Sequence, residues 1–493
     1  MRPLCPATQG FCQGGACSKL PAGRKQRVSG QTTVAVAGRR QLLGRRVLGA
    51  GICVVIQQVV GSAIRLGGNL LLTRLLPPEA FGVIAIVYAV STGLALLSDL
   101  GINQNVLVSR RGDDPVFLQT AWTMQVVRSL CIGLACATCG AAVYASTWLG
   151  LFEPGTVYSD ARLPFILCAF ALTTFAAGFE SIKIRQAQRQ LHLVRLTLLE
   201  LGSQAVGLIG TIVLAYSFRS VWALVAGAAI SGLVKIVGSH VLLPGVKARF
   251  RWDRECVRNL IQFGRWIMAS SALWFFIQSG DKLLLGGIVD ARTVGYYAIA
   301  TILLGVVQTL FLALVSSVML PSLSQVSRED QQRLRRAFLR FQLQSDLFLF
   351  STAGFLFVAG PSIAGLLYNQ HYASVGSILS ALSFGLIGLR YMVVEQYCIM
   401  QSQARVLAGW NALRAATMVL ALPTGYALFG FNGALGAVIL TQFITWPLAI
   451  RFKIRHGLQD YRSELVGIPM LVLGCALGQA YNWFFGLIFG IPH

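Results

Sequence analysis

Apolar residues gather in long blocks along the chain, and short polar stretches separate the blocks. A helix needs about 20 predominantly apolar residues to cross a bilayer, and we count thirteen blocks of about that length. Their limits are roughly 47–74, 80–108, 117–146, 163–182, 196–217, 220–243, 262–288, 294–325, 342–360, 375–400, 406–428, 432–450 and 465–488. The pattern predicts an all-α polytopic membrane protein.

One stretch of this pattern occurs twice. Residues 64–86 (IRLGGNLLLTRLLPPEAFGVIAI) align without a gap to residues 277–299 (IQSGDKLLLGGIVDARTVGYYAI). In both copies an apolar helix ends in a short polar turn, and a second apolar helix follows at once. The identical residues are Ile64, Gly67, Leu70, Leu71, Leu72, Gly82, Ala85 and Ile86, which match Ile277, Gly280, Leu283, Leu284, Leu285, Gly295, Ala298 and Ile299.

The repeat predicts a two-lobe bundle. Six spans separate the copies, an even number, so both copies enter the membrane in the same direction, as parallel repeats of transporters do. We expect an N-lobe of spans one to six (residues 47–243), a cytoplasmic linker (244–261) and a C-lobe of spans seven to twelve (262–452). One extra helix, span thirteen, follows in residues 453–493.

Composition agrees with this class. The 493 residues are 55% hydrophobic and only 12% charged, which is more apolar length than one globular core buries. The predicted loops are short, so they leave no room for a soluble catalytic domain. We therefore expect no enzyme. The chain has no GxxxxGK[ST] loop, and its histidines have no metal-ligand spacing. Cys136 and Cys139 form a CxxC inside an apolar span, where packing is the favoured interpretation.

The net charge of +23 has to be interpreted by position along the membrane. Lys and Arg cluster in alternate loops, whereas the loops between them carry only Arg74, Arg162, Arg219 and Arg292. Because cytoplasmic loops collect basic residues, the amino terminus is predicted to be cytoplasmic and the carboxyl terminus outside. A nucleic-acid partner is not expected.

Residues 1–46 form a separate basic segment. They hold nine Lys or Arg and no Asp or Glu, with many Gly, Ser and Gln, so they cannot build a packed core. We expect a disordered cytoplasmic tail. An organelle transit peptide, or a start codon placed too early, is the alternative.

Charged residues inside the apolar spans are the candidate functional residues, because each costs about 2.5–3.5 kcal/mol near a helix centre. Those in the cytoplasmic third of a span are expected to reach water or to pair within a lobe. The bases are Arg65, Arg128, Lys235, Lys282, Arg390 and Arg414, and the acids are Asp99, Glu180, Glu200, Asp281, Asp346 and Glu395.

Four of the bases are candidates for binding an anionic substrate in a central cleft. Arg65 and Lys282 lie on the two helices that carry the repeat, and Arg65 aligns with Gln278, so its charge is specific to one lobe. An arginine fork matches phosphate oxygens and stays charged when desolvated. Arg414 and Arg390 are the other two candidates. Asp281, Glu200 and Glu395 would either bind a coupling ion or balance these charges, and charge balance is favoured.

Several motifs of the sequence resemble those of bacterial polysaccharide transporters. These are the O-antigen and exopolysaccharide flippases of the multidrug/oligosaccharidyl-lipid/polysaccharide (MOP) exporter superfamily. The likeness covers about residues 47–452. It begins with LLLTRLLPPEAFGVIAI and LSDLGINQNVLV, continues in FRSVWALVAG and FGRWIMASSALWFFIQSGDKLLLGGIVDARTVGYYAIA, and ends with VMLPSLSQVSRED and QQRLRRAFLR.

The resemblance implies a V-shaped pair of six-helix lobes that moves a polyprenyl-pyrophosphate-linked oligosaccharide to the outer leaflet by alternating access. It implies a location in the bacterial inner membrane and a role in exopolysaccharide, capsule or O-antigen biosynthesis. A polysaccharide polymerase and export machinery are candidate partners, and H⁺ or Na⁺ is a candidate coupling ion; no other cofactor is expected. The alternatives are a drug or cation antiporter of the same superfamily, and a membrane glycosyltransferase or ligase using the same lipid carrier.

Overall fold

The structure, a computed structural model, describes residues 53, 55–109, 111–190, 192–315, 331–401, 403–460 and 464–489. The predicted basic tail and residues 318–330 of the last resemblance motif lie outside these ranges. Within them the chain is helical apart from turns and one isolated β-bridge between Thr156 and Asp290. The all-α class is therefore confirmed.

The helices of the first half come in the order of the predicted spans. Helix Val55–Leu75 is followed by α2 (Pro78–Leu97), α3 (Ile102–Val108), α4 (Pro115–Trp148), η1 (Val157–Ser159), α5 (Leu163–Ala177), α6 (Lys183–Arg189), α7 (Leu193–Phe218) and α8 (Trp222–Val241). Within this half α4 packs on α5, α7 packs on α8, and α5 contacts both α2 and α8.

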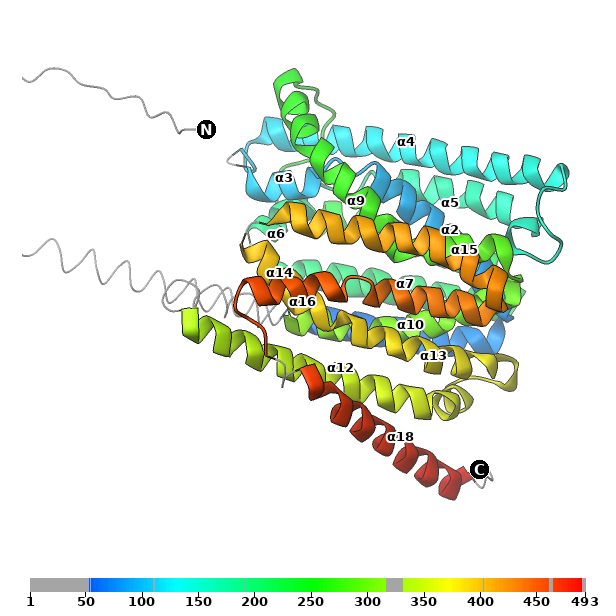
Figure 1. Cartoon of the computed structure of the whole chain (residues 1–493). Coiled ribbons are helices and arrows are strands. Elements are labelled where there is room, and N and C mark those ends of the chain that lie inside the picture. The colour runs from blue at the N-terminus through cyan, green and yellow to red at the C-terminus, as the bar shows by residue number, and fades with distance from the viewer. Residues whose placement is uncertain are drawn as a thin grey trace, which may run out of the picture. The chain divides into compact units, whose positions relative to one another are not determined.

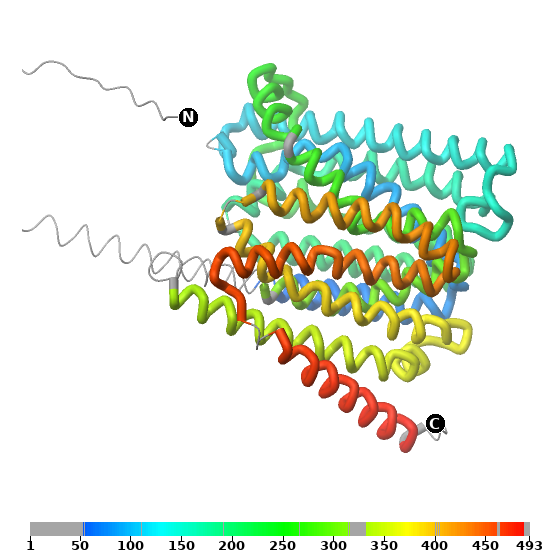
Figure 2. The backbone as a smooth tube through the Cα atoms, viewed as in Figure 1, coloured from blue at the N-terminus to red at the C-terminus, as the bar shows by residue number. Residues whose placement is uncertain are grey.

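The second half begins with the bent helix α9. Its helices are α9 (Arg254–Ile288), α10 (Ala291–Leu314), α12 (Gln331–Leu367), η3 (Gln370–Tyr372), α13 (Ser374–Gly388), η4 (Leu389–Tyr391), α14 (Met392–Met400), α15 (Ala404–Phe443), α16 (Trp446–Arg455) and α18 (Gly467–Phe489). Figure 1 shows the long helices running roughly parallel or antiparallel to one another, and in Figures 1 and 2 the last helix, α18, lies beside α12.

Ten helices among the described residues are long and apolar enough to cross a membrane, and the bent α9 makes an eleventh. The predicted count of thirteen differs for two reasons. The apolar helix α5 has only 15 residues, and the stretch Arg405–Arg455 counts once although it covers two predicted spans. The chain is a multi-pass membrane protein, and its division into six, six and one helices stays a prediction.

Local sequence fixes where several helices begin. The side chains of Asp114, Asp253 and Asp290 accept hydrogen bonds from backbone N–H groups in the first turns of α4, α9 and α10. Such caps satisfy donors that a helix leaves free at its start. Proline is at the first position of α2 and α4, where its missing N–H costs nothing. These polar signals lie between the apolar blocks, so they mark the turns.

The long helix α15 reverses direction within its length. Phe429 and Gly430 leave the helical conformation, and Gly430 has φ 61° and ψ −149°. After the reversal the two arms approach so closely that a Cβ on Gly425 would lie 2.6 Å from the carbonyl oxygen of Gly433. The break falls between the predicted spans 406–428 and 432–450.

The two copies of the sequence repeat meet where helices α2 and α10 begin. The carbonyl oxygen of Ala291 occupies the space beside Gly82, and the carbonyl oxygen of Pro78 occupies the space beside Gly295. The contact is reciprocal, because Pro78 and Gly82 align with Ala291 and Gly295 in the repeat. Only glycine, which lacks a Cβ, allows two helix backbones to come this close.

Polar contacts extend this meeting point, which we call the α2–α10 contact. Arg292 Nε donates to Glu79 Oε1 at 2.7 Å, and these two residues are also aligned in the repeat. Tyr372 donates a hydrogen bond to the carbonyl oxygen of Leu76 at 2.6 Å, and Tyr158 donates to that of Leu283 at 2.9 Å. A tyrosine of each half thus donates a hydrogen bond to a carbonyl near the end of a helix of the other half. Both bonds lie on the side that the charge pattern predicts to be outside.

Candidate functional site

A cavity of about 460 Å³ lies between helix Val55–Leu75, α2, α7 and α8. Ala298 and Ile302 of α10 add a wall from the second half of the chain. The volume is within the range of small-molecule sites, about 300–1,000 Å³. Most of the lining is apolar, and its polar side chains are Arg65, Asn69, Tyr88, Gln204, Thr211 and Ser231.

Arg65 brings a positive charge to this cavity. Its side chain donates to Ser62 Oγ at 3.0 Å, and the described residues offer it no carboxylate partner. Arg65 lies about ten residues before the helix end at Leu75. At 1.5 Å per residue this is about 15 Å, half of a hydrocarbon core about 30 Å thick. The charge therefore belongs to the middle of an apolar helix long enough to span the membrane, and the described chain supplies no counter-charge.

Two amide side chains of the cavity each have one atom without a hydrogen-bond partner within the described ranges. Asn69 is 8% exposed and its Nδ2 donates to no group, and Gln204 Oε1 accepts from none. Buried polar atoms are nearly always hydrogen-bonded, so unpaired ones in a cavity indicate a place for a ligand or water. Asn69 follows Arg65 by four residues, which puts both on one helix face. That spacing could have identified Asn69 in the sequence; nothing in the sequence marks Gln204.

Arg390 lies in a different setting, inside the second half. It is 2% exposed, and its guanidinium makes ion pairs with Asp346 at 2.8 Å and with Glu464 at 2.6 Å. Lys453 is also buried and pairs with Glu464. The cluster connects α12, η4, α16 and the segment before α18. Arg390 is thus already held by two carboxylates, and its predicted part in substrate binding stays a prediction.

Arg414 is likewise neutralised. Its Nη1 lies 2.6 Å from Glu395 Oε1, and its Nη2 donates to Thr445 Oγ1 at 3.0 Å. The pair joins α15 to α14 and is almost fully buried. Arg414, predicted to bind substrate, and Glu395, predicted to balance charge, therefore form an ion pair with each other.

Asp281 and Lys282 lie in the second half of α9. Asp281 is 7% exposed. Its Oδ2 accepts a hydrogen bond of 2.5 Å from the buried Tyr297 of α10, and its Oδ1 has no hydrogen-bond partner among the described residues. Lys282 Nζ lies 3.7 Å from the same Oδ2.

Glu200, on α7, pairs with Lys235 of α8 at 3.0 Å, and Glu180 contacts the same ammonium at 3.3 Å. The seven predicted site residues therefore do not form one cluster. Of the seven, only Arg65 lines the 460 Å³ cavity.

Comparison with known proteins adds family information to this geometry. The profile of a family described as polysaccharide biosynthesis protein matches residues 71–377. A succinoglycan biosynthesis transport protein of Rhizobium meliloti, ExoT, is 21% identical over 361 residues, which are 72% of this chain and 69% of the relative. The amylovoran biosynthesis protein AmsL of Erwinia amylovora is 24% identical over 246 residues, 48% of this chain and 62% of the relative.

Two solved structures share the fold. An inward-facing multidrug resistance MATE family transporter of the MOP superfamily aligns with a TM-score of 0.63 at 14% identity, covering 81% of this chain and 94% of the other. The lipid II flippase MurJ, in an inward closed conformation, aligns with a TM-score of 0.58 at 13% identity, covering 90% and 98%. At this identity the likeness concerns the fold.

Proposed function

Because the chain belongs to the polysaccharide biosynthesis protein family, we propose that it is a flippase for lipid-linked oligosaccharides. The substrate is a polyprenyl-pyrophosphate-linked repeat unit, which is moved from the cytoplasmic to the outer leaflet of the bacterial inner membrane. In support, ExoT is a succinoglycan biosynthesis transport protein, and MurJ, a lipid II flippase, has the same fold. The protein is a transporter and not an enzyme.

The observation that carries this proposal is the uncompensated charge of Arg65 in the cavity. A pyrophosphate offers oxygen pairs that fit the guanidinium fork. The free Nδ2 of Asn69 supplies a second donor one helical turn away. A cationic substrate would need acidic groups instead, and no carboxylate lines the cavity within the described ranges. The cavity therefore favours an anionic headgroup over the cation-antiporter alternative.

The physical task fits a two-state transporter. Sugar and pyrophosphate cannot cross hydrocarbon unaided, whereas the apolar polyprenyl chain is soluble in the hydrocarbon core. The cavity receives the headgroup near the midplane, and movement of one half against the other opens it to each side in turn. In the predicted orientation the amino terminus is cytoplasmic, and the α2–α10 contact closes the outer side.

The test is transport by purified protein in liposomes. The probe is a fluorescent oligosaccharide on polyprenyl pyrophosphate, and its arrival in the opposite leaflet is followed by a membrane-impermeant quencher. Arg65→Ala removes charge-assisted hydrogen bonds worth about 1.5–3 kcal/mol, so we expect a loss of roughly 10- to 100-fold in transport at limiting probe. Arg74→Ala is the matched control, because Arg74 lies on the same helix and does not line the cavity.

Equal transport by the wild type and Arg65→Ala would remove the headgroup site from the mechanism. Arg65→Lys separates charge from geometry. A lysine keeps the charge without the bidentate fork, so we expect its transport to fall between those of the wild type and Arg65→Ala.

A further inference from the structure

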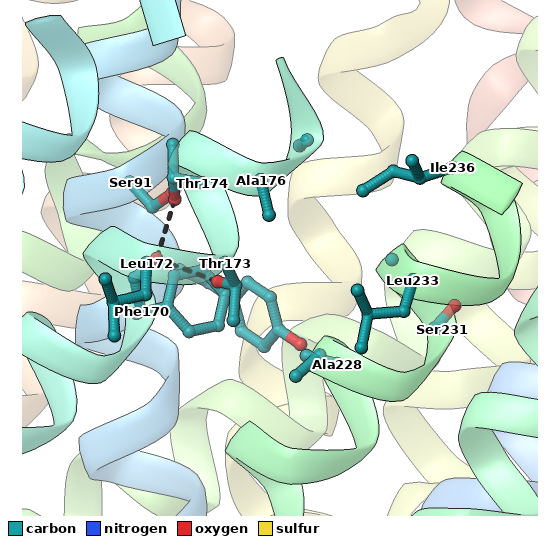
Figure 3. A pocket seen from close by; sticks show the side chains of 14 residues that line it. Ser91, Phe170, Leu172, Thr173, Thr174, Ala176, Ala228, Ser231, Leu233 and Ile236 are labelled. Atoms are coloured by element: carbon teal, nitrogen blue, oxygen red, sulfur yellow. Dashed lines mark hydrogen bonds between the residues drawn. The ribbon is translucent and has the colours of Figure 1, made fainter. Parts of the chain in front are cut away.

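A second cavity of about 630 Å³ lies between α5 and α8, with α2 behind it. Small residues on both helices create it, because Ala176 and Ala177 of α5 stand across from Ala228 and Gly232 of α8. Figure 3 shows Thr173 and Ala176 on one side of the space and Leu233 and Ile236 on the other. We call this cavity the α5–α8 crevice.

The walls of the crevice are apolar although they include hydroxyl side chains. Thr173 and Thr174 both donate to the carbonyl oxygen of Phe170, at 2.7 and 2.9 Å, and Ser91 lies 3.2 Å from Thr174 Oγ1 (Figure 3). These three hydroxyls are satisfied within the protein, and the hydroxyls of Tyr88 and Ser231 lie where the crevice adjoins the Arg65 cavity. The rest of the lining offers methyl and methylene groups. Such a surface suits a hydrocarbon chain.

The crevice adjoins the Arg65 cavity. Tyr88, Ala228 and Ser231 line both spaces, so this one layer of side chains stands between them. At its other end the crevice opens on the surface of the bundle, where Leu172 is 71% exposed and Leu233 is 56% exposed. Apolar side chains exposed on membrane-spanning helices face acyl chains. The crevice therefore lies between the cationic cavity and the apolar surface of the bundle.

We propose that the α5–α8 crevice is the lateral opening through which the polyprenyl chain of the substrate leaves the Arg65 cavity and enters the bilayer. This inference rests on the proposed function. The chain is bonded to the pyrophosphate, so it must leave the headgroup site by a route that begins beside Arg65. The crevice is an apolar route that meets this condition, and its walls supply no charge that would hold a headgroup outside the cavity.

A salt-bridged triad stands beside the cytoplasmic end of the crevice. Lys235 of α8 pairs with Glu200 of α7 and with Glu180, which follows α5 directly. The triad joins the ends of the two crevice helices through one ammonium.

Gly232 allows a direct test. A Cβ at Gly232 would meet nothing within 4 Å, so Gly232→Leu is expected to place its side chain in the crevice. Gly202 of α7 has equally open space and lines neither cavity, and Gly202→Leu is the matched control. Both changes replace a helical glycine by the same residue. Membrane abundance and unfolding temperature of each variant are measured beside transport.

We expect Gly232→Leu to lower transport of the polyprenyl-pyrophosphate oligosaccharide at least tenfold, and Gly202→Leu to leave it unchanged. Binding of inorganic pyrophosphate, which has no chain, should be the same in both variants and weaker in Arg65→Ala. Wild-type transport by Gly232→Leu, with Arg65→Ala inactive, would overturn the lateral opening and leave the proposed function standing. Wild-type transport by both would overturn the two together.

Photolabelling tests the inference on the unaltered protein. The probe is a polyprenyl pyrophosphate with a diazirine in its isoprenoid chain, in phospholipid liposomes. We expect labelled peptides from residues 172–177 and 228–236, competition by unlabelled polyprenyl pyrophosphate, and reduced labelling in Arg65→Ala. Labelling that is independent of Arg65 and of competitor would mean that bilayer lipids fill the crevice, and would overturn the proposal.

Discussion

Two arginines inside apolar helices show how surroundings decide the role of a residue. Arg390 is almost fully buried, between Asp346 and Glu464, and its guanidinium lies 5.7 Å from the centre of the Phe350 ring. Arg65 lines a cavity and has no acidic partner among the described residues. In the first arrangement the charges are neutralised within the protein, and removal of one partner leaves the other unpaired. In the second arrangement the guanidinium of Arg65 can still form charge-assisted hydrogen bonds to a ligand.

This contrast predicts opposite outcomes for the same substitution. Arg390→Leu leaves the buried carboxylate of Asp346 without its paired cation, whereas Glu464 keeps Lys453. Breaking a buried pair costs about 3–5 kcal/mol. We expect a large drop in unfolding temperature in detergent and little protein in the membrane. Arg65→Leu leaves no partner behind, so its unfolding temperature should stay close to that of the wild type while transport is lost. An Arg390→Leu protein as stable as Arg65→Leu would contradict this division.

At the scale of elements, one glycine makes two membrane helices out of α15. The backbone of Gly430, at φ 61° and ψ −149°, is in a region that other residues enter only with strain of about 1–3 kcal/mol. A Cβ at Gly430 would meet no neighbour within 4 Å. Any effect of substitution there therefore comes from the backbone and not from a clash.

We predict that Gly430→Ala lowers the free energy of unfolding by about 1–3 kcal/mol. Gly436 is the control, since it lies in the second arm of the same helix, has helical backbone and equally open space. Gly436→Ala should be neutral or stabilise by up to about 1 kcal/mol. Denaturant unfolding in mixed micelles compares the two variants. Equal effects would mean that the reversal does not depend on glycine.

At the scale of the whole molecule, one contact between the two halves is made by residues that the repeat makes equivalent. Gly82 lies against the start of α10 and Gly295 against the start of α2, and Glu79 pairs with its own counterpart, Arg292. A two-fold-related contact of this kind is self-complementary. We infer that transport requires the α2–α10 contact to open.

A reversible cross-link tests this inference. Glu79→Cys with Arg292→Cys places two thiols where the ion pair now spans 2.7 Å, and a short bifunctional methanethiosulfonate reagent joins them. We expect the cross-linked protein to stop transport and reduction to restore it. Each single cysteine variant, treated alike, reports any effect of the native cysteines. Full transport by the cross-linked protein would mean that this contact stays closed throughout the cycle.

The sequence by itself determined the class of the protein and the repeat. Apolar blocks of membrane length, together with capping residues such as Asp114 and Asp290, are local signals, and they predicted the helices. They could not decide whether α5, with 15 residues, counts as a full span. The repeat predicted that two hairpins are alike, but not that they touch, since contact depends on how the helices pack.

For the site, the sequence identified the charges but not their partners. It picked out Arg65, Arg390 and Arg414 on the same ground, that charges in hydrocarbon are costly. Only the tertiary structure decided that Arg414 lies 2.6 Å from Glu395, that Arg390 lies between two acids, and that Arg65 faces a cavity. The reason is physical: spacing along a helix fixes which residues share a face, whereas neutralisation of a charge depends on residues brought in from other helices.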